Sequence, residues 1–487
     1  MKVLLASSEV HPFSKTGGLA DMVGALGKAL ARAGHQVRTV TPFYRCVREK
    51  FPQVRPVDWQ FDLPLGAERI QGRLLALELE RGREVYFVDH PGFFDRPALY
   101  HENDISYPDN AERFVFFSKC VANLARYGSW QPDVLHVHDW QTALVPALIT
   151  HQRHSEGWGN PPPTCLTIHN LAYQGIFPAE KFALTNLPPE FFTPGGAEFY
   201  GRFNFLKTGI AFADIITTVS PRYAREILTP AAGEGLDGLL RQRQNRLFGI
   251  LNGVDCEEWD PAHDRFLVQP YSVRRLANKT ANKLALQKEL GLPVSAHVPL
   301  FGTVSRLAEQ KGVDIELAAL EEMLNRNLQF VLLGNGSPAY ERGYQELARR
   351  FPSKVAVQIG YNEALAHRIE AGCDFYLMPS RFEPSGLNQM YSLRYGTIPI
   401  VRATGGLDDS VTDFTEDPAR ANGIKFHEFS AAALSQAIRK ALALYEQPVW
   451  FRRFQRNAMK TDFSWNKTVS EYLKIYTLAK RGQLPPN

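Results

Sequence analysis

Short apolar runs alternate with amphipathic segments along most of this 487-residue chain. Apolar runs bounded by turn residues indicate buried strands, and apolar residues that recur every three or four positions indicate helices. Their alternation predicts parallel sheets covered by helices on both faces. The expected strands span residues 2–7, 37–40, 84–88, 134–137, 164–168, 215–219, 247–251, 300–304, 330–334, 355–359, 374–379 and 398–401.

Two such series follow one another, and each is about as long as one Rossmann-like domain. The segment at residues 252–261 is polar and turn-prone, and we place a hinge there. The predicted fold class is therefore α/β, with two Rossmann-like, doubly wound domains facing a cleft. The expected parts are an N-terminal domain at residues 1–246, a C-terminal domain at residues 247–460 and a helical segment at residues 461–487. Helices are expected over residues 19–32, 110–126, 203–212, 364–371, 390–395 and 466–478.

Composition narrows the class of protein. The chain is 44% hydrophobic and 22% charged, which is ordinary for a globular protein, and its net charge of +4 is too small and dispersed to indicate nucleic-acid binding. Its five cysteines are scattered without a C-x-x-C pair, which predicts reduced thiols and a cytoplasmic protein. The sequence starts with a strand rather than a secretory leader, and no apolar run is long enough to cross a membrane, so we expect no membrane partner.

Two glycine-containing stretches follow predicted strands. Residues 15–21 (KTGGLAD) come after the first strand, and residues 381–391 (RFEPSGLNQMY) come after the strand at 374–379. Ligands of open α/β sheets bind outside the carboxyl ends of the strands. The paired glycines let the backbone approach a diphosphate, and Glu383 stands where a helix start leaves free N–H groups. An acid for hydroxyls and amides for phosphate suit a sugar nucleotide.

Further charged side chains follow other predicted strands. Lys15, Arg306 and Lys311 supply cations, and Asp21, Asp139 and Glu383 supply carboxylates, all at the expected ends of strands. Any one of these residues is more often a helix cap or a surface ion pair. Their joint occurrence predicts one site, in which Lys and Arg neutralise phosphates.

Several other kinds of site are disfavoured. His136 and His138 lie on one face of a strand and could bind zinc, but no third ligand accompanies them at a suitable spacing. The chain has no Asp-x-Asp pair for Mn²⁺, no Gly-x-Ser-x-Gly elbow of a serine hydrolase and no Gly-x-Gly-x-x-Gly of a dehydrogenase after the first strand. We therefore expect neither a metal nor a cofactor.

An ordered set of motifs resembles one known family. Beside KTGGLAD at residues 15–21, the motifs are HDW at 138–140, TIHNLAYQG at 167–175, TVSP at 218–221, LNGVD at 251–255, SRL at 305–307, KG at 311–312, GY at 360–361, PSRFEP at 379–384, TGGL at 404–407 and DFSW at 462–465. They resemble the bacterial glycogen synthases and are similar to plant starch synthases. The resemblance implies a GT-B fold and a retaining glucosyltransferase that adds glucose from ADP-glucose to the non-reducing end of an α-1,4-glucan. It also implies that the C-terminal helix returns to the first domain.

The resemblance implies roles for particular residues. The implied catalytic residues are Glu383, Asp139, His169, Lys311 and Arg306. The implied substrate-binding residues are Lys15, Gly18, Asp21, Asn252, Tyr361, Ser385, Gly386, Leu387, Asn388 and Gln389. Arg306 and Lys311 would stabilise the departing ADP, Glu383 would hold hydroxyls of the donor glucose, and Tyr361 would stack on adenine. Asp139 and His169 would stabilise an oxocarbenium-like transition state.

Two positions depart from patterns common among retaining GT-B enzymes. The acid often found eight residues after Glu383 is replaced by Tyr391, and Ser385 stands where relatives often have Cys. The missing acid favours a front-face mechanism, in which the leaving phosphate oxygen accepts the proton of the acceptor, over a double displacement. A GT-B enzyme with another donor, such as UDP-glucose, and a glucan-binding protein without turnover remain as alternatives. The sequence leaves oligomeric state, regulation and acceptor length open.

Overall fold

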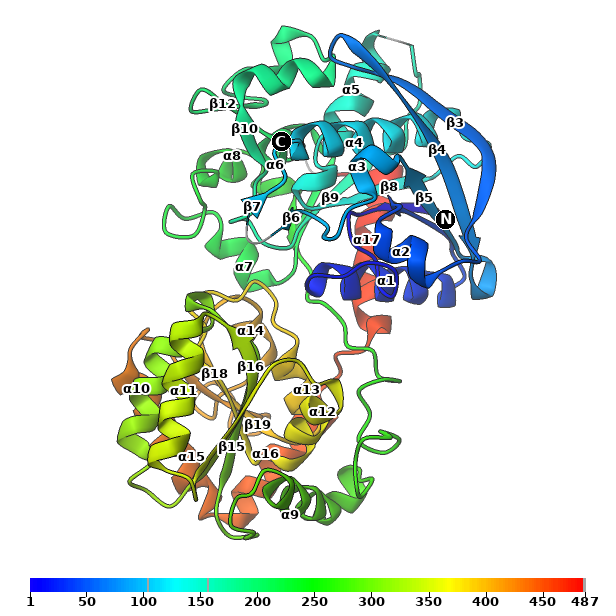
Figure 1. The fold of residues 1–487 in the computed structure, drawn as a ribbon. Helices are drawn as coiled ribbons and strands as arrows, with labels where there is room; N and C mark the ends of the chain where they lie inside the picture. Colours follow the sequence, from blue (N-terminus) through cyan, green and yellow to red (C-terminus); the bar gives the residue numbers. More distant parts are fainter. Residues whose placement is uncertain (103–104, 156, 485–487) are drawn as a thin grey trace. The chain divides into compact units, whose positions relative to one another are not determined.

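The computed structural model describes residues 1–102, 105–155 and 157–484, and it divides into two compact units. The first unit comprises residues 1–253 and 465–487, and the second comprises residues 254–464. Each unit contains its own parallel sheet with helices packed against it (Figure 1). None of the helices in the described ranges has the length and apolar character needed to cross a membrane.

The first unit is built on a sheet that has nine strands among the described residues. In spatial order they are β14 (Leu247–Gly249), β13 (Ile215–Thr218), β9 (Thr164–Ile168), β8 (Val134–His138), β1 (Lys2–Ala6), β2 (Gln36–Pro42), β5 (Glu84–Asp89), β4 (Glu68–Glu78) and β3 (Arg55–Leu65). All pair in parallel from β14 to β5, and β4 and β3 form an antiparallel hairpin at the edge. Leu5 on β1 is in register with Thr39 on one side and His136 on the other.

Helices cover the first sheet, and shorter elements border it. The helices are α1 (Gly18–Arg32), α2 (Arg45–Lys50), α3 (Pro91–Phe94), α4 (Asn110–Tyr127), α5 (Val145–Ser155), α6 (Phe205–Phe212), α7 (Pro221–Glu226), α8 (Asp237–Gln242) and α17 (Trp465–Lys480). The 3-10 turns are η1 (Glu80–Gly82), η2 (Trp140–Thr142), η3 (Ala179–Thr185), η4 (Pro189–Phe191) and η5 (Gln244–Arg246). Small strands are β6 (His101–Glu102), β7 (Ile105–Ser106), β10 (Ile176–Pro178), β11 (Glu198–Phe199) and β12 (Arg202–Asn204).

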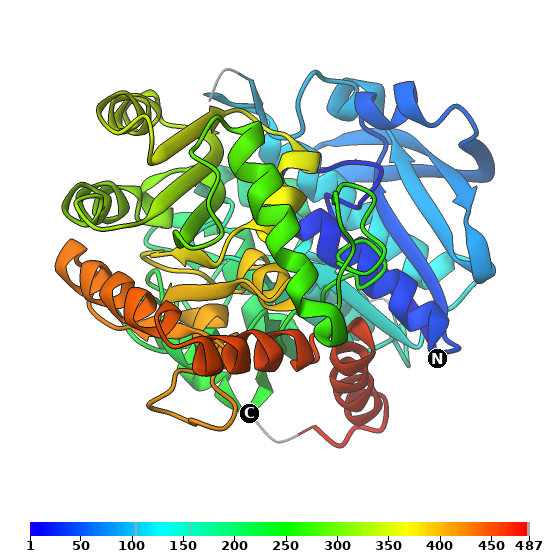
Figure 2. The same cartoon turned by 90° about the horizontal axis from the view of Figure 1, so that it is seen from below.

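The second unit is built on a sheet that is entirely parallel across its described strands. In spatial order they are β17 (Val355–Ile359), β16 (Gln329–Gly336), β15 (Leu300–Leu307), β18 (Phe375–Met378), β19 (Ile398–Arg402) and β20 (Ile424–Phe426). Its helices are α9 (Lys279–Glu289), α10 (Val313–Met323), α11 (Pro338–Arg350), α12 (Glu363–Gly372), α13 (Asn388–Arg394), α14 (Gly405–Ser410), α15 (Ala431–Tyr445) and α16 (Pro448–Lys460), with 3-10 turns η6 (Val273–Asn278) and η7 (Glu309–Lys311). Helices α15 and α16, drawn in orange and red-orange, follow one another end to end with only residues 446–447 between them (Figure 2).

One strand lies in a different sheet from the one expected. The strand near residue 247 was expected to open the second domain, but β14 pairs with β13 and is the edge strand of the first sheet. The division between the units accordingly falls after Gly253 rather than after residue 246. The sequence analysis also did not predict the β3–β4 hairpin, whose strands are partly exposed.

The C-terminal helix α17 is part of the first unit and of its core. Tyr472 and Tyr476 are fully buried, and the Tyr476 hydroxyl lies 2.6 Å from Nδ1 of His136 on β8. At the start of the helix, a Cβ on Gly253 would lie 2.7 Å from the Trp465 ring, so only glycine allows the two segments to approach this closely. The last segment of the chain therefore completes a domain that the first half of the sequence begins.

Candidate active site

The order in which the chain adds strands to the first sheet reverses at β1. The chain runs outward through β2 and β5 on one side of β1, and through β8, β9 and β13 on the other. Such a switch point leaves a crevice outside the carboxyl ends of the central strands, where ligands of open α/β sheets bind. Three segments leave β1, β8 and β9 at this edge. They carry, in turn, residues 15–21, which we call the glycine loop, Asp139 and His169.

A buried carboxylate fixes the glycine loop. Glu9 is 3% exposed and accepts hydrogen bonds from the backbone N–H of Thr16 at 2.5 Å, from the Thr16 hydroxyl at 2.6 Å and from the Gly17 N–H at 3.3 Å. The Tyr100 hydroxyl donates to the same carboxylate at 2.8 Å. Glu9 thus holds the backbone of the loop in one conformation just before α1 begins. Sequence reasoning missed this residue, because the spacing of Glu9 and Thr16 does not by itself indicate contact.

The glycine loop is open on its outer side. A Cβ built on Gly17 or Gly18 would meet no other atom within 4 Å among the described residues, so the fold itself does not require glycine at either position. The Lys15 ammonium lies 2.8 Å from Oδ2 of Asp21, and both side chains are partly exposed. The structure thus brings together three residues predicted to bind substrate, Lys15, Gly18 and Asp21.

Asp139 and His169 also lie together at this edge. The backbone N–H of His169 donates to Oδ1 of Asp139 at 2.7 Å. Asp139 has φ 56° and ψ −175°, a conformation that is nearly restricted to glycine and costs about 1–3 kcal/mol in other residues. Burial raises the pKa of the Asp139 carboxyl to about 7. A strained backbone that carries a carboxyl of raised pKa is typical of functional sites.

His136 and His138 are buried beside His169 in the first unit. The two rings lie 4.1 Å apart, and Nδ1 of His138 lies 3.2 Å from Nε2 of His169. Both ring nitrogens of His136 are engaged, one with the Tyr476 hydroxyl and the other with Thr167. Burial lowers the pKa of His136 and of His169 to about 3, so both rings are neutral at pH 7. The histidines form a buried, neutral hydrogen-bonded group.

Asn252 lies beyond β14, in the same unit. Its side chain is 6% exposed, and Oδ1 is buried without a hydrogen-bond partner in the described part of the chain. A buried amide oxygen without a partner costs free energy, and residues with such atoms are candidates for ligand contacts.

The second sheet has its own switch point between β15 and β18. The chain runs from β15 to β16 and β17 on one side, and from β18 to β19 and β20 on the other. Lys311 follows β15 and Glu383 follows β18, and the Lys311 ammonium lies 2.5 Å from Oε2 of Glu383. The Ser380 hydroxyl also donates to this carboxylate, at 3.1 Å. The structure therefore pairs two predicted catalytic residues that are 72 positions apart.

Arg306 stands at the end of β15 in a different environment. Its side chain is exposed, and it makes no side-chain hydrogen bond or ion pair with any residue that the structure describes. A charged guanidinium without a protein partner is available to an anionic ligand.

Glycines allow the loops around Glu383 to pack closely. A Cβ on Gly405 would lie 2.0 Å from the carbonyl oxygen of Glu383, and one on Gly406 would lie 1.9 Å from that of Ser385. A Cβ on Gly312 would lie 2.1 Å from the carbonyl oxygen of Pro379. The start of α14 and the residue after Lys311 are thus pressed against the turn that carries Glu383.

Asn388 and Gln389, two of the predicted binding residues, make hydrogen bonds within the second unit. The Asn388 amide donates to the Val304 carbonyl at 2.7 Å and to the Tyr376 hydroxyl at 2.8 Å. The Gln389 amide donates to the carbonyl oxygens of Ser385 and Gly386, at 3.0 and 3.1 Å. The amide nitrogens of these two side chains therefore support the turn from inside. Leu387 caps the N-terminus of α13 with its backbone.

Tyr361 has the opposite character. It lies in the loop between β17 and α12, and 81% of its surface is exposed. An exposed aromatic ring at the carboxyl end of a strand suits stacking on a flat ligand group.

Comparison with known proteins decides the family. A family model described as the starch synthase catalytic domain matches residues 2–242, and one described as glycosyl transferases group 1 matches residues 292–458. The chain is 45% identical to Glycogen synthase 2 of Geobacter sulfurreducens, over 98% of this chain and 99% of that protein. It is 47% identical to the Glycogen synthase of an Anaeromyxobacter species, with the same coverage.

The chain belongs to the glycogen synthase family. Its structure is similar to the catalytic domain of Starch Synthase IV from Arabidopsis thaliana, which was solved bound to ADP and acarbose, with a TM-score of 0.88 and 35% identity over 98% of this chain and 99% of that one. The GT-B fold and glucosyltransferase activity in glycogen synthesis, both expected from the motifs, are confirmed by these relatives. Its substrates are accordingly a nucleotide sugar and a glucan.

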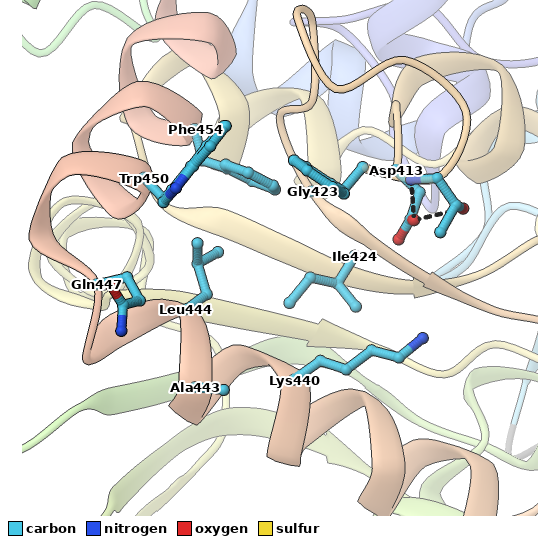
Figure 3. Close-up of a pocket in the computed structure, with 11 residues that line it drawn as sticks. Asp413, Gly423, Ile424, Lys440, Ala443, Leu444, Gln447, Trp450 and Phe454 are labelled. Carbon is cyan, nitrogen blue, oxygen red and sulfur yellow. Dashed lines mark hydrogen bonds between the residues drawn. The ribbon is translucent and has the colours of Figure 1, made fainter.

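A pocket of about 500 Å³ in the second unit lies apart from the residues that the glycogen synthase motifs single out (Figure 3). It is mostly apolar and lies between α15, α16 and β20. Its lining consists of Asp413, Phe414, Thr415, Gly423, Ile424, Lys440, Ala443, Leu444, Gln447, Trp450 and Phe454. None of the predicted substrate-binding residues belongs to this lining, so the pocket is not part of the proposed donor site.

Proposed function

We propose that this glucosyltransferase uses ADP-glucose and transfers glucose to the 4-hydroxyl at the non-reducing end of an α-1,4-glucan, with retention of configuration. The observation that carries the proposal is the group formed by Lys311, Glu383 and Arg306 at the switch point of the second sheet. Two cations and one carboxylate leave a net positive charge where ligands of such sheets bind. The Arabidopsis relative solved with ADP supports the choice of donor.

In this proposal the donor binds mainly to the second unit. Arg306 and Lys311 neutralise the diphosphate and stabilise the charge that grows on ADP as it departs. Glu383 accepts hydrogen bonds from donor hydroxyls through Oε1, since Lys311 and Ser380 bind Oε2 and no residue in the described ranges hydrogen-bonds to the other oxygen. Tyr361 stacks on adenine.

In the proposal, groups of the first unit contact the phosphates, the reacting sugar and the acceptor. The open backbone at Gly18, with Lys15, approaches the phosphates, and Asp21 and Asn252 contact the sugar and the acceptor. The low pKa of His169 keeps its imidazole neutral at pH 7, which suits a sugar that gains positive charge in the transition state. A cationic imidazole at the same place would oppose that charge. Asp139, partly ionised near pH 7, stabilises it.

The proposed chemistry is a front-face displacement. The bond between the anomeric carbon and the ADP oxygen breaks, the acceptor oxygen attacks from the same face, and the acceptor proton passes to the leaving phosphate oxygen. Tyr391 occupies the position at which related enzymes often carry a second acid, and its ring stacks on Trp259 at 3.8 Å. Tyrosine at this position does not supply the carboxylate that a double displacement would use, which supports the front-face route.

The test is release of nucleoside diphosphate from ADP-glucose and from UDP-glucose, each with and without glycogen. We expect glycogen-dependent release from ADP-glucose, with elongated glucan as the product, and much slower release from UDP-glucose. Equal or faster release from UDP-glucose would transfer the proposal to the other donor. Glycogen binding without release from either donor would indicate a glucan-binding protein. We further propose a cytoplasmic location, which fractionation of the source cells tests.

A further inference from the structure

Three potential metal ligands meet in the second unit, away from Lys311 and Glu383. Ligand atoms of Glu258, Glu363 and His367 all lie within 4.8 Å of one another. Glu363 and His367 are four positions apart on α12, so their side chains share one face of that helix. Glu258 comes from the loop that begins the second unit. Both glutamates are exposed, whereas His367 is 1% exposed.

The state of the His367 ring distinguishes this group from an ordinary acidic cluster. Its Nδ1 lies 2.8 Å from Oδ2 of Asp264, and the Tyr395 hydroxyl donates to the same oxygen at 2.6 Å. Its Nε2 is buried and has no hydrogen-bond partner within the described ranges. A carboxylate that accepts a hydrogen bond from one ring N–H leaves the other ring nitrogen unprotonated and fixes its orientation. Histidines that bind metal ions are commonly held in this way.

Packing fixes the plane of this ring as well. The Trp259 ring stacks on His367 with 3.9 Å between centroids and 11° between planes. Trp259 is the neighbour of Glu258 in the sequence, so the stack also places the loop that carries this carboxylate beside α12. The ring is thus held on its face by Trp259 and at its edge by Asp264.

We propose that Glu258, Glu363 and Nε2 of His367 bind one divalent transition-metal ion, for which Zn²⁺ is the best probe. One imidazole and two carboxylates suit Zn²⁺ and similar borderline ions, whereas Mg²⁺ and Ca²⁺ prefer oxygen ligands alone. Three protein ligands leave a position for water, and the exposed glutamates allow the ion to enter. The ion joins the loop at residues 254–264 to α12 and stabilises the second unit. It takes no part in the proposed glucosyl transfer.

The experiment uses the full chain after treatment with a chelator. We expect 100 µM Zn²⁺ to raise the Tm of the wild-type protein by about 3 °C, and the same concentration of Mg²⁺ to leave it unchanged. Glu258→Gln and Glu363→Gln should each remove most of this shift. Both residues are exposed, so neither variant is expected to unfold. Glu346→Gln, which changes an exposed glutamate on α11, is the matched control and should keep the full shift.

Equilibrium dialysis separates this site from zinc bound by cysteines elsewhere. The wild-type protein and Glu346→Gln should bind one equivalent of zinc more than the variant that combines Glu258→Gln with Glu363→Gln. His367→Gln should lose the same equivalent. Equal stoichiometry and equal Tm shifts in all variants would overturn the proposal. Loss of zinc binding together with unchanged glucosyl transfer would support a stabilising role apart from catalysis.

Discussion

The two switch points of this molecule have the same topology and different chemistry. In the second unit, the edge of the sheet carries formal charges: Lys311 is paired to Glu383 at 2.5 Å, and Arg306 is exposed near the end of β15. In the first unit, the principal groups are an open glycine backbone, a strained Asp139 and the neutral ring of His169.

The difference shows that the same sheet topology can carry different ligand-binding chemistry in the two units. Full charges at the second switch point suit a diphosphate, which brings its own negative charge and leaves with more. At the first, the neutral ring of His169 and the Asp139 carboxyl suit a sugar whose positive charge is transient, and the open backbone near Gly18 leaves space for phosphates. In both units the Rossmann-like sheet fixes where a ligand can bind, and the side chains that follow each strand determine which chemical groups the ligand meets.

The largest effect is expected at Lys311. Lys311→Ala removes a proposed phosphate contact and also leaves Glu383, which is 7% exposed, without its cation. We expect kcat to fall at least about a hundredfold, because loss of one group that stabilises developing charge has about this effect. We also expect Tm to fall by about 3 °C or more, since a buried carboxylate that loses its partner is destabilising. Steady-state kinetics and calorimetry on one preparation measure both.

A double variant separates the two effects of Lys311. Lys311→Met combined with Glu383→Gln removes both charges, so Tm should return to within about 2 °C of the wild type. Activity should remain low, because both proposed contacts to the donor are missing. Recovery of activity together with Tm would mean that the ion pair only supports the fold.

Arg306 differs from Lys311 because its charge is not paired with a carboxylate in the described structure. Since its guanidinium is exposed and makes no hydrogen bond or ion pair with the described residues, Arg306→Ala should leave Tm within about 1 °C of the wild type. We expect kcat/KM for ADP-glucose to fall about a hundredfold. Arg306→Lys should recover only part of this loss, because an ammonium cannot bind phosphate through two parallel hydrogen bonds. Near-normal turnover in Arg306→Ala would remove this residue from the mechanism.

Asp139 tests the first unit through pH. The carboxyl has a pKa of 3.8 as an isolated group and about 7 in the folded protein. Between these values the unfolded chain loses a proton that the folded protein keeps, so rising pH lowers the stability of the wild type. Asp139→Asn keeps an oxygen that accepts from the His169 N–H but has no charge to bury. We therefore expect its Tm, relative to the wild type, to increase from pH 5 to about pH 7 and to level off near pH 8.

The control for this experiment is a carboxyl outside the site. Asp58→Asn, on exposed β3, should show a constant difference in Tm over the same range. The low pKa of His169 affects the wild type and both variants equally and cancels in the comparison. A flat profile for Asp139→Asn would contradict the raised pKa.

The sequence was sufficient to locate most of the parallel strands along the chain and the polar residues that follow them, although the three-residue strand β20 was not expected. Parallel strands that are buried on both faces have continuous apolar runs, so they stand out without any knowledge of the partners. β14 was assigned to the wrong domain because its three residues carry no signal about which sheet they join. The β3–β4 hairpin escaped because it lies at an edge and exposes many of its positions.

Pairings across long sequence separations could not be predicted. Lys311 and Glu383 are 72 positions apart in the sequence. Tyr100 and Glu9, whose hydrogen bond supports the glycine loop, are 91 positions apart. The bonds from the amide nitrogens of Asn388 and Gln389 to backbone carbonyl oxygens carry no signal in the sequence either. Sequence shows which polar residues lie near a switch point, and only the packed structure shows which way each one points.

The smallest expected effect concerns the glycines of the two units. Gly18→Ala adds a Cβ that meets no atom within 4 Å in the described structure, at the first position of α1. Because alanine restricts the unfolded chain, Tm should stay the same or rise by about 1–2 °C. Gly405→Ala should lower Tm by several degrees, because the added Cβ would lie 2.0 Å from the carbonyl oxygen of Glu383 and Gly405 has a φ of +45°.

Kinetics complete the comparison of the two glycines. If the open space beside Gly18 admits the phosphates of the donor, the added methyl group should raise KM for ADP-glucose about three- to tenfold, which corresponds to about 1 kcal/mol. Affinity for glycogen should be unchanged, since the acceptor does not need the space beside the loop. A variant that keeps its Tm and loses donor affinity shows that the glycine is retained for the ligand. Unchanged KM would show that the loop at residues 15–18 lies outside the donor site, and the second unit would then bind the diphosphate by its formal charges alone.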